Sequence, residues 1–266
     1  MKYIILLLVT SISFAQSPWT REKGKSYVQL GFTSLTYDAY QLNGTRVENF
    51  GTISDITIQA YAEYGITNKL EAQLVLPFKS VSIDNAGVSE SISGAGNVSL
   101  GLKYKLLDAN WKVSGGLLYS AKSAQFDEDI GLSTGFNAAT ILPYITVGSS
   151  YKKFYYFTAI GYGYMDNNYS DYLKATFELG YNVIKNGHII FVFDTRNIVS
   201  KESAFENDLA QSPSYLDRQT FNAIGLKANY EFVKDKFGAN FATFGATGID
   251  NAPLAPTLNL GIYAKL

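Results

Sequence analysis

The side chains of this chain that could do chemistry are charged residues set among alternating polar and apolar positions. The candidates, in chain order, are Glu63, Glu71, Lys79, Lys103, Lys174, Glu178, Asp194, Arg196, Lys227 and Glu231. Side chains alternate between the two faces of a β-strand, so each charge is expected on the polar face of its strand. When such a face lines a pore, its charges select solutes. These ten residues are the candidate lumen-lining residues.

The same charges have a second interpretation, in which they pair with one another and close the space they surround. Asp194 and Arg196 lie two positions apart on one strand face, as do Asn229 and Glu231. Ion pairs among such groups would hold opposite walls together, and mixed signs argue against strong selectivity for anions or cations. The sequence leaves a narrow channel and a closed interior as equal alternatives.

Catalytic and metal chemistry find little support among the residues. His188 is the only histidine, and it follows the Asn186-Gly187 turn. A nucleophilic site would need a serine and a carboxylate beside it, and the sequence shows no such constellation. Acidic residues at 127–129 and 166–171 could hold Ca²⁺ loosely through oxygen ligands, although solvated loops are the favoured interpretation. We therefore expect no enzyme activity, no metal site and no cofactor.

The composition is typical of an exported all-β chain. The 266 residues include 17% charged and 15% aromatic residues and no cysteine. Soluble domains usually carry ~25% charged residues, and a chain without cysteine has neither a disulfide framework nor a thiolate site. A net charge of −1 gives no basic field for nucleic acid. The length suits one large β domain.

The N-terminus has the features of a secretory signal peptide. Lys2 supplies a positive charge, residues 4–9 form an apolar run, and Ser13-Phe14-Ala15 places small residues where a signal peptidase reads them. The apolar run is shorter than the ~20 residues of a spanning helix. The expected organisation is a signal peptide at residues 1–15 and an outer-membrane β-barrel at residues 16–266.

The element that must position the charges is an amphipathic strand repeated along the chain. In residues 70–79, for example, apolar Leu70, Ala72 and Leu74 alternate with polar Glu71 and Gln73. The expected strands are residues 26–37, 55–66, 70–83, 96–107, 111–122, 137–151, 154–165, 172–184, 188–199, 219–233, 238–248 and 256–266. The pattern predicts an all-β fold: a closed antiparallel transmembrane β-barrel of about twelve strands, an even number as in bacterial outer-membrane barrels.

The faces of most strands can be assigned from this alternation. Ser99 and Lys103 are expected to face inward, and Leu100 and Leu102 to face lipid. The strand at residues 154–165 stays ambiguous because aromatic side chains occupy both of its faces.

The connections between the expected strands alternate in length. Short turns lie at residues 67–69, 108–110, 152–153, 185–187 and 234–236, and the other connections, mostly long and polar, at 38–52, 84–95, 123–136, 166–171, 200–218 and 249–255. Outer-membrane barrels combine short periplasmic turns with longer outer loops, whereas a soluble β-sandwich has no reason to alternate so regularly. We therefore expect the cell outer membrane as the location. The expected partners are outer-membrane lipid and lipopolysaccharide, the barrel-assembly machinery and an unidentified small solute, with no nucleic acid.

Two stretches of the chain resemble a known family. Residues 64–71 read YGITNKLE and are followed by Leu76-Pro77-Phe78, and residues 94–107 read GAGNVSLGLKYKLL. Both patterns resemble those of the meta-pathway phenol-degradation outer-membrane protein family, which consists of transporter-like barrels. The resemblance implies passage of small, hydrophobic or aromatic molecules across the outer membrane. It carries over no catalytic residue, and it implies that Gly94 and Gly96 let the chain fold sharply into the next strand.

The functional expectation is therefore a narrow channel or uptake route for small molecules. The alternative is a non-conducting structural or surface-interaction barrel whose outer loops carry the function. The sequence identifies neither the substrate nor the state of the lumen.

Overall fold

The computed structural model describes residues 16–199 and 212–266. The predicted signal peptide at residues 1–15, and residues 200–211 of the predicted loop 200–218, lie outside the described residues.

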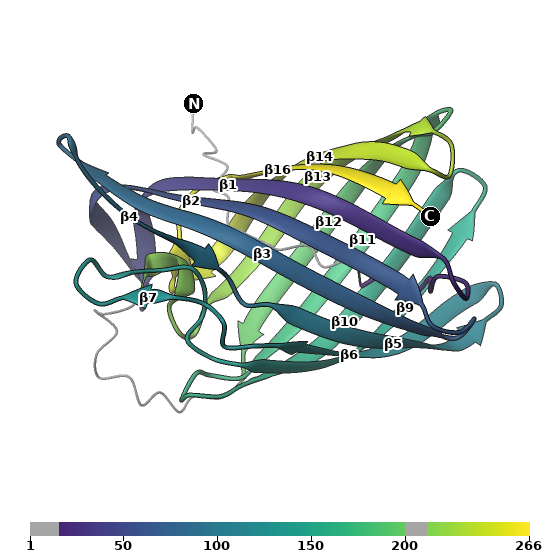
Figure 1. Cartoon of the computed structure of the whole chain (residues 1–266), viewed down its shortest axis with the longest axis horizontal. Helices are drawn as coiled ribbons and strands as arrows, with labels where there is room; N and C mark the ends of the chain where they lie inside the picture. The colour runs from purple at the N-terminus through teal and green to yellow at the C-terminus, as the bar shows by residue number, and fades with distance from the viewer. Residues whose placement is uncertain (1–15, 200–211) are drawn as a thin grey trace.

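Twelve antiparallel strands close into a barrel, as the sequence pattern predicts (Figure 1). They are β1 (Ser26–Leu42), β2 (Thr45–Gly65), β3 (Leu70–Asn85), β5 (Ser99–Asp108), β6 (Trp111–Ser120), β9 (Thr140–Tyr151), β10 (Phe154–Met165), β11 (Tyr172–Ile184), β12 (Gly187–Ile198), β13 (Thr220–Val233), β14 (Phe237–Asp250) and β16 (Thr257–Lys265). Each pairs with the next barrel strand in the chain, and β1 pairs with both β2 and β16, which closes the sheet. No helix among the described residues is long and apolar enough to cross a bilayer.

The two faces of the barrel wall differ as predicted. On β5, Ser99 is 1% exposed and its neighbour Leu100 is 58% exposed. β10 is no longer ambiguous, because Phe157 and Ala159 are buried inside while Ile160 faces outward. A closed barrel leaves no unpaired strand edge in its wall, and its outward face is apolar, which are the two requirements for spanning a bilayer with strands.

Two predicted loops are wrong. Residues 38–52 are the paired ends of β1 and β2, and residues 84–95 contain the end of β3 and β4 (Val88–Ala95). Each hairpin turns through two residues with positive φ, Asn43-Gly44 and Ala86-Gly87, which suits a two-residue hairpin. Both hairpins extend past the rest of the wall at the left of Figure 1. Outside the membrane a strand needs no apolar face, so alternation could not reveal these extensions.

The glycine prediction is also wrong in its mechanism. Gly94 lies within β4, and neither Gly94 nor Gly96 has positive φ. A Cβ at Gly96 would instead lie 3.1 Å from both the Pro77 side chain and the Thr134 carbonyl oxygen. This glycine is needed for close packing rather than for a sharp turn.

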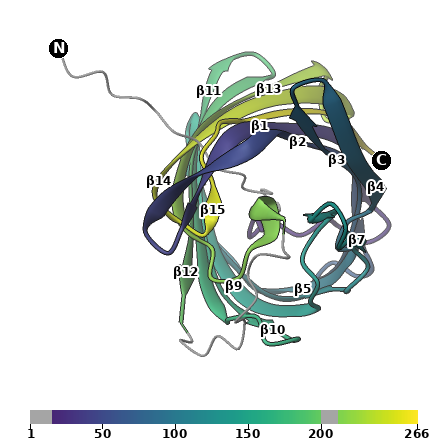
Figure 2. The ribbon, with the colours of Figure 1, turned by 90° about the vertical axis from the view of Figure 1, so that its left-hand side faces the viewer.

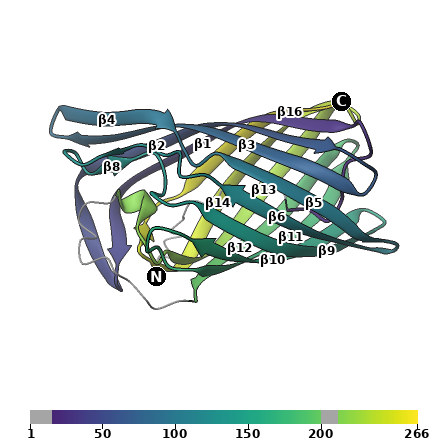
Figure 3. The same ribbon diagram turned by 60° about the horizontal axis from the view of Figure 1, so that its bottom comes forward.

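The two ends of the barrel are built differently. The short turns gather at the end where β1 begins and β16 ends, at the right of Figure 1. At the other end, the short strands β7 (Phe126–Asp127) and β8 (Leu132–Ser133) and the 3-10 helix η2 (Pro213–Tyr215) fold over the barrel mouth (Figures 2 and 3). β15 (Ala252–Pro253) pairs with β1 there. We refer to the short-turn end as the inner end and to the other as the outer end.

Candidate functional site

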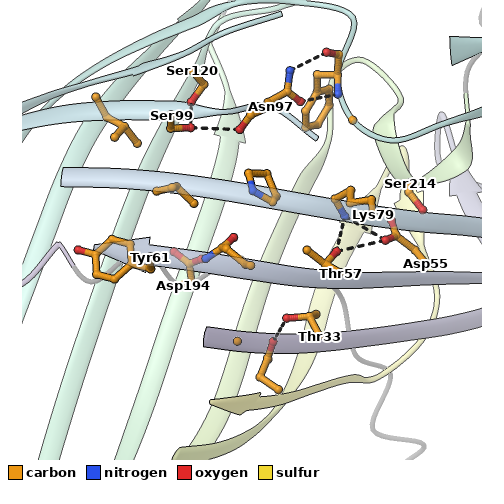
Figure 4. Close-up of a pocket in the computed structure, with 18 of the residues that line it drawn as sticks. Thr33, Asp55, Thr57, Tyr61, Lys79, Asn97, Ser99, Ser120, Asp194 and Ser214 are labelled. Carbon is orange, nitrogen blue, oxygen red and sulfur yellow. Dashed lines mark hydrogen bonds and ion pairs between the residues drawn. The ribbon is translucent and has the colours of Figure 1, made fainter. Parts of the chain in front are cut away.

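The barrel encloses a cavity of about 290 Å³. Side chains from strands all around the wall line it, together with residues of η2 and of the β8–β9 connection. The charged lining residues are Asp55, Lys79, Lys174, Asp194, Arg196 and Lys227, and the aromatic ones include Tyr61, Phe136, Tyr172, Tyr215, Phe221 and Phe244. Figure 4 shows polar side chains from several strands converging on this space. The lumen therefore offers both ionic and aromatic contacts to a small molecule.

The ten predicted lumen residues all lie on the inward face, but only half of them reach the cavity. Lys79, Lys174, Asp194, Arg196 and Lys227 line it. Glu63, Glu71, Lys103, Glu178 and Glu231 are buried but are not part of its lining. A role in solute passage stays a prediction for all ten.

A polar cluster near the outer end joins the wall to η2. The Lys79 ammonium donates to Asp55 Oδ1 at 2.9 Å and to Thr57 Oγ1 at 2.7 Å, and Figure 4 shows these three side chains pointing toward one another. The Tyr215 hydroxyl, from η2, donates to Asp55 Oδ2 at 2.5 Å. Burial, and then the Asp55 carboxylate, raise the pKa of the Tyr215 phenol well above its usual value, so this group stays a neutral donor.

Further contacts hold η2 inside the barrel mouth. Ser214 hydrogen-bonds the Tyr37 hydroxyl at 2.8 Å, and its carbonyl oxygen accepts from Gln219 Nε2 at 2.8 Å. The ring centroids of Tyr215 and Phe136 lie 5.4 Å apart in an edge-on arrangement. The outer end is thus narrowed by a segment held through side chains rather than by strand pairing.

The inner end contains the N-terminal segment, residues 16–23, which enters the lumen as irregular chain. Lys103 Nζ donates to the carbonyl oxygens of Ser17 and Trp19 at 3.1 and 3.0 Å and lies 2.9 Å from Glu71 Oε1. The Ser114 hydroxyl donates to the Pro18 carbonyl oxygen at 2.7 Å. Lys103 and Glu71 stand directly opposite each other on β5 and β3, and both side chains are 0% exposed.

A second buried acid fixes the same segment. Arg21 Nε lies 2.6 Å from Glu63 Oε2, and the Arg21 backbone N–H donates to Glu71 Oε2 at 2.7 Å. The Trp19 ring packs edge-on against Tyr155, with centroids 6.0 Å apart. Glu63, Glu71 and Lys103 therefore anchor the N-terminal segment rather than line the open space.

Several residues of these clusters were missed by sequence reasoning. Asp55 stands two, four and six residues before Thr57, Gln59 and Tyr61 on the same inward face, so alternation counted back from Glu63 could have found it. Arg21 lies in irregular chain and Tyr215 in a 3-10 helix of three residues, which are both without a periodic signal.

The remaining predicted acids have other partners. Glu178 lies 3.9 Å from Lys227 Nζ, and Glu231 pairs with Lys265. Asp194 accepts from Thr176 at 2.7 Å and lies 3.7 Å from Lys174 Nζ. It makes no ion pair with Arg196 among the described residues. Interior ion pairs thus exist, yet they leave a cavity between them.

The histidine and the acidic stretches show no catalytic or metal arrangement in the described part of the chain. A ring nitrogen of His188 meets the Asn182 amide at 3.3 Å, and its ring lies 6.3 Å from that of Tyr155. Across residues 16–199 and 212–266, no three acidic or histidine side chains are grouped so as to hold a metal ion.

Comparisons with known proteins agree with this fold. The family model described as "Putative MetA-pathway of phenol degradation" matches residues 20–246. The COG4313 outer membrane channel from Pseudomonas putida F1 shares 16% identity at a TM-score of 0.75, covering 96% of this chain and 100% of its own. The KdgM porin shares 8% identity at a TM-score of 0.52, covering 89% of this chain and 98% of its own. A TodX mutant, a monoaromatic hydrocarbon channel, shares 11% identity at 0.50, covering 98% and 95%.

These structural likenesses establish the fold, that of outer-membrane barrels. None of the curated proteins matches the sequence. The closed wall, its apolar exterior and this fold place the chain in the cell outer membrane, with the short-turn inner end toward the periplasm.

Proposed function

This chain belongs to the "Putative MetA-pathway of phenol degradation" family, and from that membership and its lumen we propose that it is a narrow outer-membrane uptake route for small molecules. The observation that carries the proposal is the cavity of about 290 Å³ inside a closed barrel. A structural barrel has no need of such a space, because interiors otherwise pack to the density of organic crystals.

The size and lining of the cavity limit the solute. Drug-sized ligands occupy pockets of roughly 300–1,000 Å³, so this cavity suits a molecule of about one ring. Phe136, Tyr172, Phe221 and Phe244 offer aromatic surface, and Lys79 and Asp55 offer polar contacts. The monoaromatic hydrocarbon channel among the structural neighbours is consistent with a solute of this size.

Passage requires movement of the two segments that narrow the ends. Both the N-terminal segment and η2 contact the wall through side chains, without pairing to a barrel strand. Each of these hydrogen bonds can break without disturbing the others, at a net cost of about 0.5–1.5 kcal/mol for a neutral bond and about 1.5–3 kcal/mol for a bond to a charged group. The barrel wall can stay intact while either end opens.

The experiment compares single-channel conductance in planar bilayers for the wild-type barrel and for a variant lacking residues 16–23. We expect small steps for the wild type and larger steps for the deletion, because the segment no longer fills the inner end. Uptake by a strain lacking the protein is measured in parallel, so that transfer of an uncharged solute is also detected. No steps from either folded protein, together with normal uptake by that strain, would refute a transport role.

A second function is favoured by the outer hairpins. Phe50 and Val88 are 86% and 67% exposed on the two hairpins that extend past the rest of the wall (Figure 1). These hairpins could contact lipopolysaccharide or another surface partner, as a non-conducting barrel would. Silent bilayers combined with loss of a surface interaction on deleting residues 44–51 would favour this alternative. The barrel-assembly machinery is a proposed partner in either case.

A further inference from the structure

Arg196 lies against the cavity from β12, and most of its donors have no partner among the described residues. Its guanidinium carbon lies 3.9 Å from the centroid of the Tyr172 ring and 5.1 Å from that of Phe136. One Nη2–H donates to the sulfur of Met165 at 3.3 Å, and the buried Nε–H has no hydrogen-bond partner. All four side chains line the cavity. A guanidinium carries five N–H donors, so this group has capacity for a ligand.

The other basic groups of the cavity are balanced by carboxylates. Lys79 is 2.9 Å from Asp55, Lys174 is 3.7 Å from Asp194, and Lys227 is 3.9 Å from Glu178. Within residues 16–199 and 212–266, no carboxylate oxygen comes within 4.0 Å of the Arg196 guanidinium nitrogens. Of the four cations that line the cavity, Arg196 is thus the one without an ion pair among the described residues.

The neighbouring charged groups of the described chain make no ion pair with Arg196. Lys174 stands directly opposite Arg196 in the β11–β12 register, and its ammonium pairs with Asp194. The Asp217 carboxylate acts on Arg196 through its charge, but it accepts its hydrogen bonds from the Ser170 backbone N–H and hydroxyl at 2.7 and 3.0 Å. The Arg196 donors are therefore available to a ligand that brings its own acceptors.

We propose that the cavity holds a small aromatic carboxylate, with the carboxylate on Arg196 and the ring against Phe136 and Tyr172. This rests on the proposed uptake function, whose solute class it narrows. The planar guanidinium fork matches a carboxylate in two parallel hydrogen bonds. A neutral hydrocarbon would leave the cation unpaired in the desolvated wall, which is unfavourable. An inorganic anion has no apolar part, so the aromatic and thioether side chains of the cavity would have no contact with it.

The proposal differs from what the sequence indicates about selectivity. Mixed charges along the strands argue against a preference for one sign. In the described part of the chain, however, three of the four cavity cations have ion pairs and Arg196 has none. A preference for anions can thus come from one residue in a lumen of mixed charge.

The test measures binding to the purified full-length barrel in detergent by calorimetry. The probes are benzoate and benzamide, which share a ring and nearly the same shape but differ in charge. We expect benzoate to bind at least about tenfold more tightly than benzamide, as a charge-assisted bidentate contact predicts. Arg196→Gln should abolish this preference. The matched control is Arg46→Gln, which removes an exposed arginine on the outer hairpin away from the cavity and should keep the preference.

A second variant keeps the proposal falsifiable. Arg196→Met preserves an apolar contact with Met165 and Tyr172, and it should lose the preference in the same way if the Gln variant does not fold. Equal binding of the two probes by the wild type, or an unchanged preference in either Arg196 variant, would overturn the proposal.

A flux arm separates this proposal from the proposed function. Vesicles containing the barrel are assayed for entry of both probes above the rate of empty vesicles. If neither probe enters but the preference for benzoate still requires Arg196, the site stands and the transport role fails. If both enter equally in wild type and Arg196→Gln, and binding shows no preference, transport stands and the anion site is refuted.

Discussion

Lys103 and Glu71 form a completely buried ion pair at the inner end, and replacing one partner should be costly. The Lys103 ammonium contacts Glu71 at 2.9 Å and the carbonyl oxygens of Ser17 and Trp19 at 3.1 and 3.0 Å. Lys103→Met fills similar space but leaves the buried Glu71 carboxylate without its ion-pair partner, with hydrogen bonds from the Gln73 amide and the Arg21 backbone N–H. Breaking a buried pair in this way costs about 3–5 kcal/mol of the free energy of unfolding.

The assay is equilibrium unfolding by urea of the barrel in lipid vesicles, followed by tryptophan fluorescence. Trp19 packs against Tyr155 and Phe157 in the lumen, so its signal also reports release of the N-terminal segment. Glu71→Gln combined with Lys103→Met should recover most of the loss, because no charge is then left buried and the amide oxygen can still accept the hydrogen bond from the Arg21 N–H. The control, Arg46→Met, breaks a pair whose side chains are 56% and 65% exposed and should cost at most about 1 kcal/mol.

Two outcomes would refute this reasoning. The first is a cost for Lys103→Met no larger than that for Arg46→Met. The second is a double variant no more stable than the single one, which would mean that the stranded charge is not the cause.

Three further predictions concern the wall, the outer end and the histidine. Leu100→Arg should lower barrel stability by about 2–4 kcal/mol near the bilayer midplane, while Ser99→Arg on the lumen face should be tolerated better in the same unfolding assay; equal costs would contradict the assigned faces. Tyr215→Phe removes the hydrogen bond to Asp55, so protease added to whole cells should cleave η2 of the variant faster than η2 of the wild type. Unchanged cleavage would count against that anchor. His188→Ala should leave conductance and uptake unchanged, since this residue is not part of the cavity lining and its ring meets the Asn182 amide and the Tyr155 ring. Loss of uptake by a folded variant would show a role that we do not assign.

The barrel wall could be predicted from the sequence because two solvents act on its two faces. Lipid outside and a polar lumen inside force the period of two, so the strands at 154–165 and 172–184 have the predicted bounds and Ser99 and Leu100 the predicted faces. Where either the lipid or the polar lumen is absent, the alternation of polar and apolar residues is lost. Most residues of the hairpin ends at 38–52 and 84–95 are exposed or half-buried, and polar residues there resemble loops.

The two segments inside the lumen could not be predicted for a different reason. Arg21 meets Glu63 across 42 positions of sequence, and Tyr215 meets Asp55 across 160. Both segments are irregular, so their residues carry no periodicity that would indicate a buried partner. The sequence identifies the inward-facing charged residues as a group. Which of them anchor a segment and which line the cavity depends on these long-range contacts.

The central claim is that solute passes through the lumen, and the absence of native cysteine allows a direct measurement. Gln59 lines the cavity, whereas its neighbour Ile58 is 50% exposed on the lipid face. Conductance is recorded for Gln59→Cys and Ile58→Cys before and after a charged, thiol-specific reagent is added. Passage through the lumen predicts that the reagent reduces conductance for Gln59→Cys alone. A channel whose conductance stays the same after confirmed modification at position 59 would contradict the account.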